Sequence, residues 1–160
     1  MKSLLLAFLF VPCLVNGQED LLANVREQIA MAFQEEEVSE SLNKQFDEFE
    51  HFGQPILNGY KGALLMAKSK HALNPFKKLS NFNKGKEILE SALAKAYQNI
   101  ELRFLRLTIQ VNVPGFLGYN ENINEDIEYI ESNLIFMENL ELRDKMNDFI
   151  TKARKEGKLE

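Results

Sequence analysis

The chain has 160 residues but only one cysteine, two histidines, four prolines, eight glycines and no tryptophan. A single cysteine excludes a fold stapled by internal disulfides. Too few cysteines and histidines are present for a zinc site built from four of them. The low glycine and proline content excludes collagen-like and low-complexity classes. Hydrophobic residues at 45% and charged residues at 27% are typical of one globular domain of this length.

The first seventeen residues have the parts of a secretory signal peptide. Met1 and Lys2 form a basic start, residues 3–15 are almost wholly apolar, and Val15 and Gly17 fit a cleavage site after Gly17. The apolar run is shorter than the roughly 20 residues that span a bilayer. We therefore expect an exported chain that begins at residue 18 after cleavage. It would be periplasmic or secreted, and it would have no transmembrane segment.

Cys13 raises the alternative of a bacterial lipoprotein. Pro12 and the bulky Phe10 fit the residues that precede a lipidated cysteine poorly, and Cys13 lies inside the apolar run rather than at its end. We expect Cys13 to be removed with the signal peptide. The remaining residues 18–160 would then contain no thiol nucleophile and no thiolate metal ligand.

From residue 18 onward, apolar residues recur at the three- and four-residue spacing of amphipathic helices. This spacing predicts an all-α fold: a compact bundle of about six to seven antiparallel helices in a single domain, residues 18–160. A helix is predicted to begin near Ser80 or Asn81, either of which could cap it. Residues 107–113 alternate between apolar and polar, which is a strand pattern. Because no partner strand is evident, we favour a helix over residues 99–113.

Charge is segregated along the chain. Residues 18–50 carry 10 acidic and 2 basic side chains, residues 51–112 carry 3 and 10, and residues 113–160 carry 11 and 6. The simplest interpretation is that the acidic flanks neutralise the basic centre within the fold. The alternative is a basic patch for an anionic partner or for membrane headgroups, formed by Lys68, Lys70, Lys77, Lys78, Lys84 and Lys86. Nucleic acid is not an expected partner, because the chain is acidic overall and has no nucleic-acid-binding motif.

Arg103, Arg106 and Gln110 share one face of the predicted helix over residues 99–113. Two arginines at this spacing could hold a carboxylate or a phosphate through forked hydrogen bonds. The alternative is that they pair with the acidic helices of the chain itself. The loop at residues 114–119 could add Phe116 and Tyr119 to a binding edge, or it could plug the core.

Tyr60 completes the set of candidate binding residues. It lies in the segment Gly59-Tyr60-Lys61-Gly62, where small neighbours favour close helix packing. No catalytic residue, cofactor or metal ligand is assigned. The acidic run at residues 35–37 is interpreted as a solvated helix face. Residues 120–126 lack the central glycine and terminal glutamate of a calcium-binding loop, so helix capping by Asn122 or Asn124 is the better account.

Residues 83–99 resemble the second helix of a tetratricopeptide repeat. Gly85 stands at the small position, Leu89 at the large one and Ala92 at the alanine position, whereas Tyr97 replaces the expected proline. Residues 56–72 would be the first helix, so the hairpin covers about residues 56–97. Together with residues 82–86, 99–106 and 114–119, this segment resembles a family of small exported bacterial proteins of uncharacterised function. The resemblance implies export and one divergent helical repeat, but no activity.

These features predict an exported, non-enzymatic interaction protein. We expect a protein or peptide to bind a surface that includes Arg103, Arg106 and the 116–119 loop, because helical hairpins present grooves suited to peptides. The alternative is a small-ligand or anion-binding protein in which the same two arginines close a pocket. Enzymatic acid–base chemistry is the least favoured reading, since no constellation of residues indicates it. The partner and the oligomeric state are left open by the sequence.

Overall fold

The computed structural model describes residues 13–48 and 53–159. Within them the chain forms seven α-helices, two short 3₁₀ helices and no strand. The elements are α1 (Cys13–Ala32), α2 (Glu36–Asp47), α3 (Pro55–His71), α4 (Pro75–Lys95), α5 (Ile100–Asn112), η1 (Gly115–Leu117), α6 (Ile123–Asn133), η2 (Leu134–Phe136) and α7 (Leu140–Lys155). The predicted all-α bundle is confirmed. Most of the predicted signal peptide, residues 1–12, lies outside the described residues.

Helix α4 begins six residues earlier than the periodicity predicted. Its cap is Asn74, whose Oδ1 atom accepts hydrogen bonds from the backbone N–H groups of Phe76 and Lys77 at 2.9 and 3.2 Å. Pro75 follows at the first helical position, where its missing N–H and fixed φ are tolerated. The predicted caps at Ser80 and Asn81 were therefore wrong. All residues from 73 to 80 are exposed, so this turn of helix carries no apolar periodicity.

Helix α5 explains the alternating pattern that resembled a strand. The helix lies between two hydrophobic clusters and contributes to both. Leu105 and Ile109 pack into the cluster formed by α1 to α4, whereas Leu107 and Val111 pack into the cluster formed with α6 and α7. Burial on two sides places apolar residues at every second position. The preference for a helix here is confirmed.

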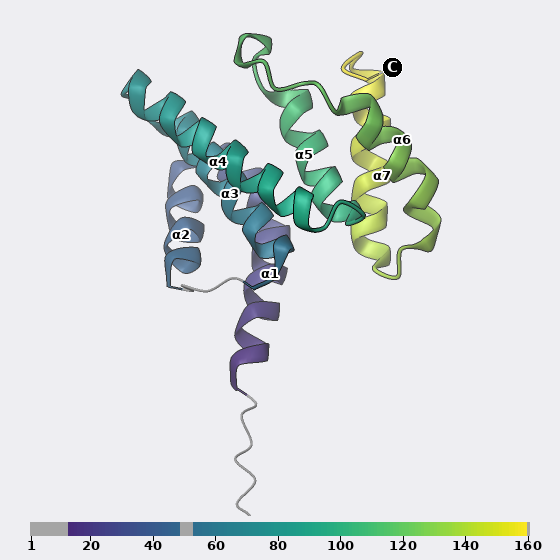
Figure 1. The fold of residues 1–160 in the computed structure, drawn as a ribbon, viewed down its shortest axis with the longest axis horizontal. Helices are drawn as coiled ribbons and strands as arrows, with labels where there is room; N and C mark the ends of the chain where they lie inside the picture. Colours follow the sequence, from purple (N-terminus) through teal and green to yellow (C-terminus); the bar gives the residue numbers. More distant parts are fainter. Residues whose placement is uncertain (1–12, 49–52, 160) are drawn as a thin grey trace, which may run out of the picture.

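Helices α3 and α4 form a long antiparallel hairpin, with α1 and α2 packed against α3 and with α5 beside it (Figure 1). The two hairpin helices approach each other at Gly62 and Gly85. A Cβ atom built at Gly85 would lie 2.5 Å from the carbonyl oxygen of Gly62, so only glycine fits this crossing. Helices α6 and α7 cover the other side of α5 (Figure 1). Among the described residues, no helix combines the length and the apolar character needed to cross a membrane.

Candidate functional site

Arg103 and Arg106 lie on the side of α5 that faces α6, and Asp126 lies between them. The side chains of the two arginines are 9% and 8% exposed, and that of Asp126 is fully buried. Arg106 forms a two-pronged pair with Asp126, with Nε–Oδ2 and Nη2–Oδ1 distances of 2.7 and 2.8 Å. Nη1 of Arg103 donates to Asp126 Oδ1 at 2.9 Å. The fork that could hold a ligand carboxylate therefore holds a carboxylate of the chain itself.

Arg103, Arg106 and Asp126 form an arginine cluster, and one further hydrogen bond of Arg106 extends it to α4. The Nη1 atom of Arg106 donates to Glu90 Oε2 at 2.9 Å. Burial works against the charged guanidinium, but the hydrogen bond and charge of Asp126 outweigh it, and the pKa of Arg106 is raised. For these two arginines the alternative interpretation, pairing with acidic segments, is confirmed. An external anion would have to displace Asp126 or Glu90.

Arg103 ties the turn between α4 and α5 to helix α6. Its Nε atom donates to the backbone oxygen of Tyr97 at 2.8 Å, and Nη1 also donates to Glu125 Oε1 at 2.8 Å. The guanidinium lies 4.3 Å from the centre of the Tyr129 ring, in cation–π geometry. The hydrogen bond from Arg103 lowers the pKa of Glu125. Arg103 therefore links helix α5 to the turn that precedes it and to helix α6.

Tyr119 anchors the end of the loop that follows α5. It is 3% exposed, and its hydroxyl donates to Glu90 Oε1 at 2.5 Å. The ring meets Phe82 edge-on at 6.1 Å between centroids, and Lys86 Nζ lies 4.7 Å from its centre. Glu90 thus accepts bonds from both Tyr119 and Arg106, which connects the loop to the arginine cluster.

Replacing Tyr119 with phenylalanine should make the free energy of unfolding fall less steeply at alkaline pH. Burial, followed by the hydrogen bond to Glu90, raises the pKa of Tyr119 well above its ordinary value. The unfolded chain therefore loses this proton above about pH 10, while the folded chain keeps it, and the free energy of unfolding falls as the pH rises. Urea unfolding at about pH 9 and about pH 11 should show a smaller decrease for Tyr119→Phe than for the wild type. Equal decreases for the two proteins would contradict a raised pKa of Tyr119 in the folded chain.

Gln110 lies at the far end of the same face of α5. Its Nε2 atom donates to Asn122 Oδ1 at 3.2 Å. Asn122 precedes α6 with φ of −106° and ψ of 4°, outside the extended conformation of a capping residue, and it makes no side-chain cap, so the predicted capping by Asn122 was wrong. The Oε1 atom of Gln110 is buried and has no hydrogen-bond partner among the described residues. Gln110 therefore fixes the start of α6 rather than presenting itself at the surface.

Phe116 is separated from the cluster and reaches solvent. Its side chain is 87% exposed at the centre of η1, three residues before the buried Tyr119. Gly118 adopts φ of 58°, the left-handed conformation that turns the chain between the two aromatic residues. The loop was predicted either to bind a partner or to plug the core. Tyr119 enters the core, and Phe116 is displayed outward.

Tyr60 belongs to a second buried polar cluster. Its hydroxyl donates to Glu101 Oε1 at 2.8 Å, and Arg26 holds the same carboxylate through Nε and Nη2, both at 2.6 Å. Burial, followed by the charge of Glu101, raises the pKa of Tyr60. This cluster ties α1 to α3 and α5. Tyr60 is 4% exposed and does not share a surface with Phe116.

The partners of these residues were missed by the sequence analysis. Asp126 and Glu90 were counted only within charged segments, and Arg26 and Glu101 were not singled out. The opposite charge of residues 51–112 and of their flanks was a signal for Asp126 alone, because Glu90 and Glu101 lie within the basic segment and Arg26 lies within an acidic one. That signal predicts pairing between segments, but it does not identify which side chains meet.

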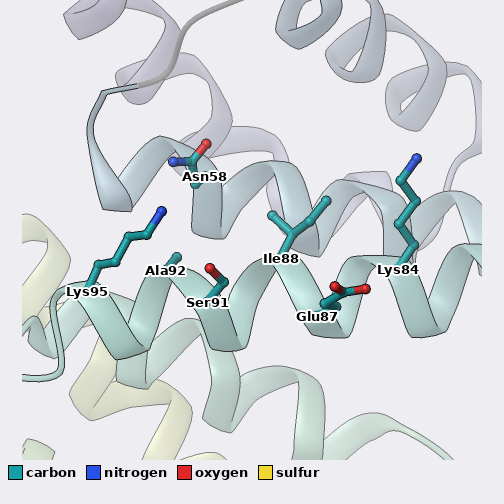
Figure 2. Close-up of a pocket in the computed structure, with 7 residues that line it drawn as sticks. All are labelled: Asn58, Lys84, Glu87, Ile88, Ser91, Ala92 and Lys95. Atoms are coloured by element: carbon teal, nitrogen blue, oxygen red, sulfur yellow. The ribbon is translucent and has the colours of Figure 1, made fainter.

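A shallow groove lies between α3 and α4 near the open end of the hairpin. Figure 2 shows Asn58 of α3 across from a row of α4 side chains. Lys84 and Lys95 stand at the two ends of the row, and Glu87 lies between them. The mixed charge and open shape do not favour one class of small ligand.

The two polar clusters consist of ion pairs and hydrogen bonds between side chains of the chain itself. Among the described residues, no group of three or more histidine, cysteine, aspartate or glutamate side chains could hold a metal ion.

No family model matches the chain, and no curated protein or solved structure is significantly similar to it.

Proposed function

We propose that this chain is an exported, non-enzymatic protein that binds a protein or peptide partner around Phe116. One observation carries the proposal: a large aromatic side chain is 87% exposed on a loop whose other end is fixed in the core by Tyr119. Exposed aromatic residues on ordered segments are frequent anchors of protein interfaces. A loop that is already held in place also loses little conformational entropy on binding.

Arg103, Arg106 and Gln110 then act as positioning residues. Arg106 and Tyr119 share Glu90, so the arginine cluster sets the direction of the loop. Gln110 and Asn122 fix the segment where the chain leaves the loop and enters α6. The surface proposed for binding is thus built on buried ion pairs, and its exposed contact is Phe116.

Export belongs to the same proposal. The basic start, the apolar run and the residues around Gly17 support cleavage near Gly17 and release into the periplasm or the medium. The helical hairpin of α3 and α4, with glycines at its crossing, supports the resemblance to a single divergent tetratricopeptide repeat. Such a scaffold is suited to presenting loops and grooves to other chains.

A photo-reactive benzoylphenylalanine at position 116 tests the proposed surface. The matched control carries the same residue at Phe136, which is 74% exposed on η2. In the cells that produce the protein, we expect one cross-linked product with a protein partner from position 116 and not from position 136. Phe116→Ser should weaken recovery of that partner at least about tenfold, as expected for a hot-spot residue.

Other outcomes of this experiment would contradict the proposal. Equal products from positions 116 and 136 would mean that the contact is not specific to the loop. No product from position 116, combined with a small molecule that co-purifies with the chain, would favour the ligand-binding alternative. Circular dichroism of each variant checks that the helical fold is retained.

A further inference from the structure

The tip of the α3–α4 hairpin exposes three large apolar side chains. Leu73 is 99% exposed, Phe76 is 85% exposed and Leu79 is 51% exposed. They belong to a run of eight consecutive exposed residues, 73–80. Figure 1 shows this end of the hairpin projecting beyond α2. Exposed apolar side chains gathered on one short segment mark a site of interaction rather than ordinary surface.

The tip is an ordered feature. Asn74 caps α4 through two backbone N–H groups, and Pro75 fixes the first helical residue. Below the tip, the close crossing at Gly62 and Gly85 holds α3 and α4 together. The apolar side chains are therefore presented by a rigid two-helix arm.

The charge around the tip is predominantly positive. Residues 51–86 include seven lysines and no aspartate or glutamate. Lys70, Lys77 and Lys78 lie close in sequence to the exposed apolar side chains, and none takes part in a salt bridge among the described residues.

Carboxylates are also present near the base of the tip. Glu36 and Glu40 of α2 line a small cavity together with Lys68, His71, Ala72, Lys77 and Asn81. Leu73, Phe76 and Lys78 do not line this cavity. The acidic side chains therefore balance part of the charge at the base, while the end of the arm carries apolar and basic residues.

We propose that the hairpin tip inserts into the interfacial region of an anionic lipid bilayer. Leu73 and Phe76 would enter below the headgroups, and Lys70 and Lys78 would contact the lipid phosphates, since Lys77 lines the cavity that also holds Glu36 and Glu40. Lysine is suited to this place because its aliphatic stem lies along apolar surface while its ammonium group stays in the polar layer. Juxtaposed apolar and basic side chains are the pattern of interfacial membrane contact.

A bilayer fits the tip better than a protein pocket or a second copy of this chain. The apolar side chains are exposed at the end of the hairpin, and a lipid surface requires no complementary cavity. The other exposed apolar cluster, Ile135, Phe136 and Leu140, is flanked in sequence by Glu138 and Glu141. Its acidic surroundings would be repelled by anionic lipid, so we do not expect this cluster to contact the same membrane. The inference goes beyond the proposed protein partner and uses a different surface.

Single tryptophans can report on the tip because the chain contains none. The probes are Phe76→Trp and, as the matched control, Phe116→Trp, whose native side chains are 85% and 87% exposed. Each is mixed with vesicles of equal parts phosphatidylglycerol and phosphatidylcholine. We expect the emission of Phe76→Trp to shift to the blue, with no shift for Phe116→Trp. The readout is local, so it does not depend on whether the amino-terminal segment has been removed.

Binding measured by vesicle flotation supplies the second readout. Leu73→Ser with Phe76→Ser should reduce binding at least about tenfold, because two large apolar side chains are lost. Lys70→Gln with Lys78→Gln should also reduce it at least about tenfold at low salt, since each lysine near an anionic surface is worth about fivefold. Circular dichroism should show an unchanged helical fold, because all four side chains are exposed.

Several results would overturn the inference. An unchanged Phe76→Trp spectrum with anionic vesicles would exclude insertion, and an equal shift with phosphatidylcholine alone would exclude a role for the anionic headgroup. A blue shift without vesicles that grows with protein concentration would identify a second copy as the occupant. Equal shifts for both tryptophan variants would show that the tip is not the inserted segment.

Discussion

Asp126→Asn should lower the free energy of unfolding by about 3–5 kcal/mol, as expected when one partner of a buried ion pair is removed. Asp126 is fully buried and accepts hydrogen bonds from both Arg103 and Arg106. Asparagine keeps the shape of the side chain but removes its charge, and its amide group would direct N–H donors toward an arginine. Two guanidinium groups would then remain in a buried site with a smaller compensating charge. Urea denaturation should show a lower midpoint and an unchanged slope.

Glu125→Gln is the matched control for this prediction. Glu125 pairs with the same Arg103 atom at 2.8 Å, but its side chain is 60% exposed. Water can replace the carboxylate there, so the expected loss is below about 1 kcal/mol. If the two variants lost the same stability, burial of Asp126 would not be the reason for its importance. Both variants remove one negative charge, so a larger loss for Asp126→Asn reflects the burial of Asp126 and its three hydrogen bonds rather than the charge alone.

The helices could be predicted from the sequence because their apolar faces repeat with a helical period. The start of α4 is the exception. The first turn of α4 is exposed, so only Asn74 and Pro75 marked its start, and periodicity placed the helix too late. Helix α5 was harder because Leu105 and Leu107 pack into different clusters, which a single amphipathic face does not describe.

The residues that α5 contributes to the candidate site could be predicted from the sequence, but their partners could not. Helical spacing places Arg103, Arg106 and Gln110 on one face of α5 without any tertiary information. Their partner Asp126 lies 20 residues beyond Arg106, on a helix whose contact with α5 depends on how both helices pack. The same limit applies to Tyr60, which meets Glu101 across 41 residues of sequence. Charge segregation predicted pairing of the kind that Arg103 and Arg106 make with Asp126, but it gave no signal for Glu90 or Glu101, which lie within the basic segment.

Gly62→Ala should lower the free energy of unfolding by about 2 kcal/mol, although alanine is the better helix former by about 1 kcal/mol. A Cβ atom at residue 62 would lie 2.6 Å from the carbonyl oxygen of Gly85 and 2.8 Å from the backbone nitrogen of Leu89. These backbone atoms belong to a regular helix and cannot move alone. Helices α3 and α4 would have to separate, and the side chains packed between them would lose contact.

Two other glycines turn this prediction into a test of backbone contact. At Gly53 a Cβ atom would meet nothing within 4 Å, so Gly53→Ala should change stability by less than about 0.5 kcal/mol. At Gly59 the nearest atom is the end of the Leu102 side chain, which can rotate, so the loss should fall between the other two. Thermal or urea unfolding should therefore show the largest loss of stability for Gly62→Ala, a smaller loss for Gly59→Ala and the smallest change for Gly53→Ala. A neutral Gly62→Ala would mean that the hairpin tolerates a wider crossing.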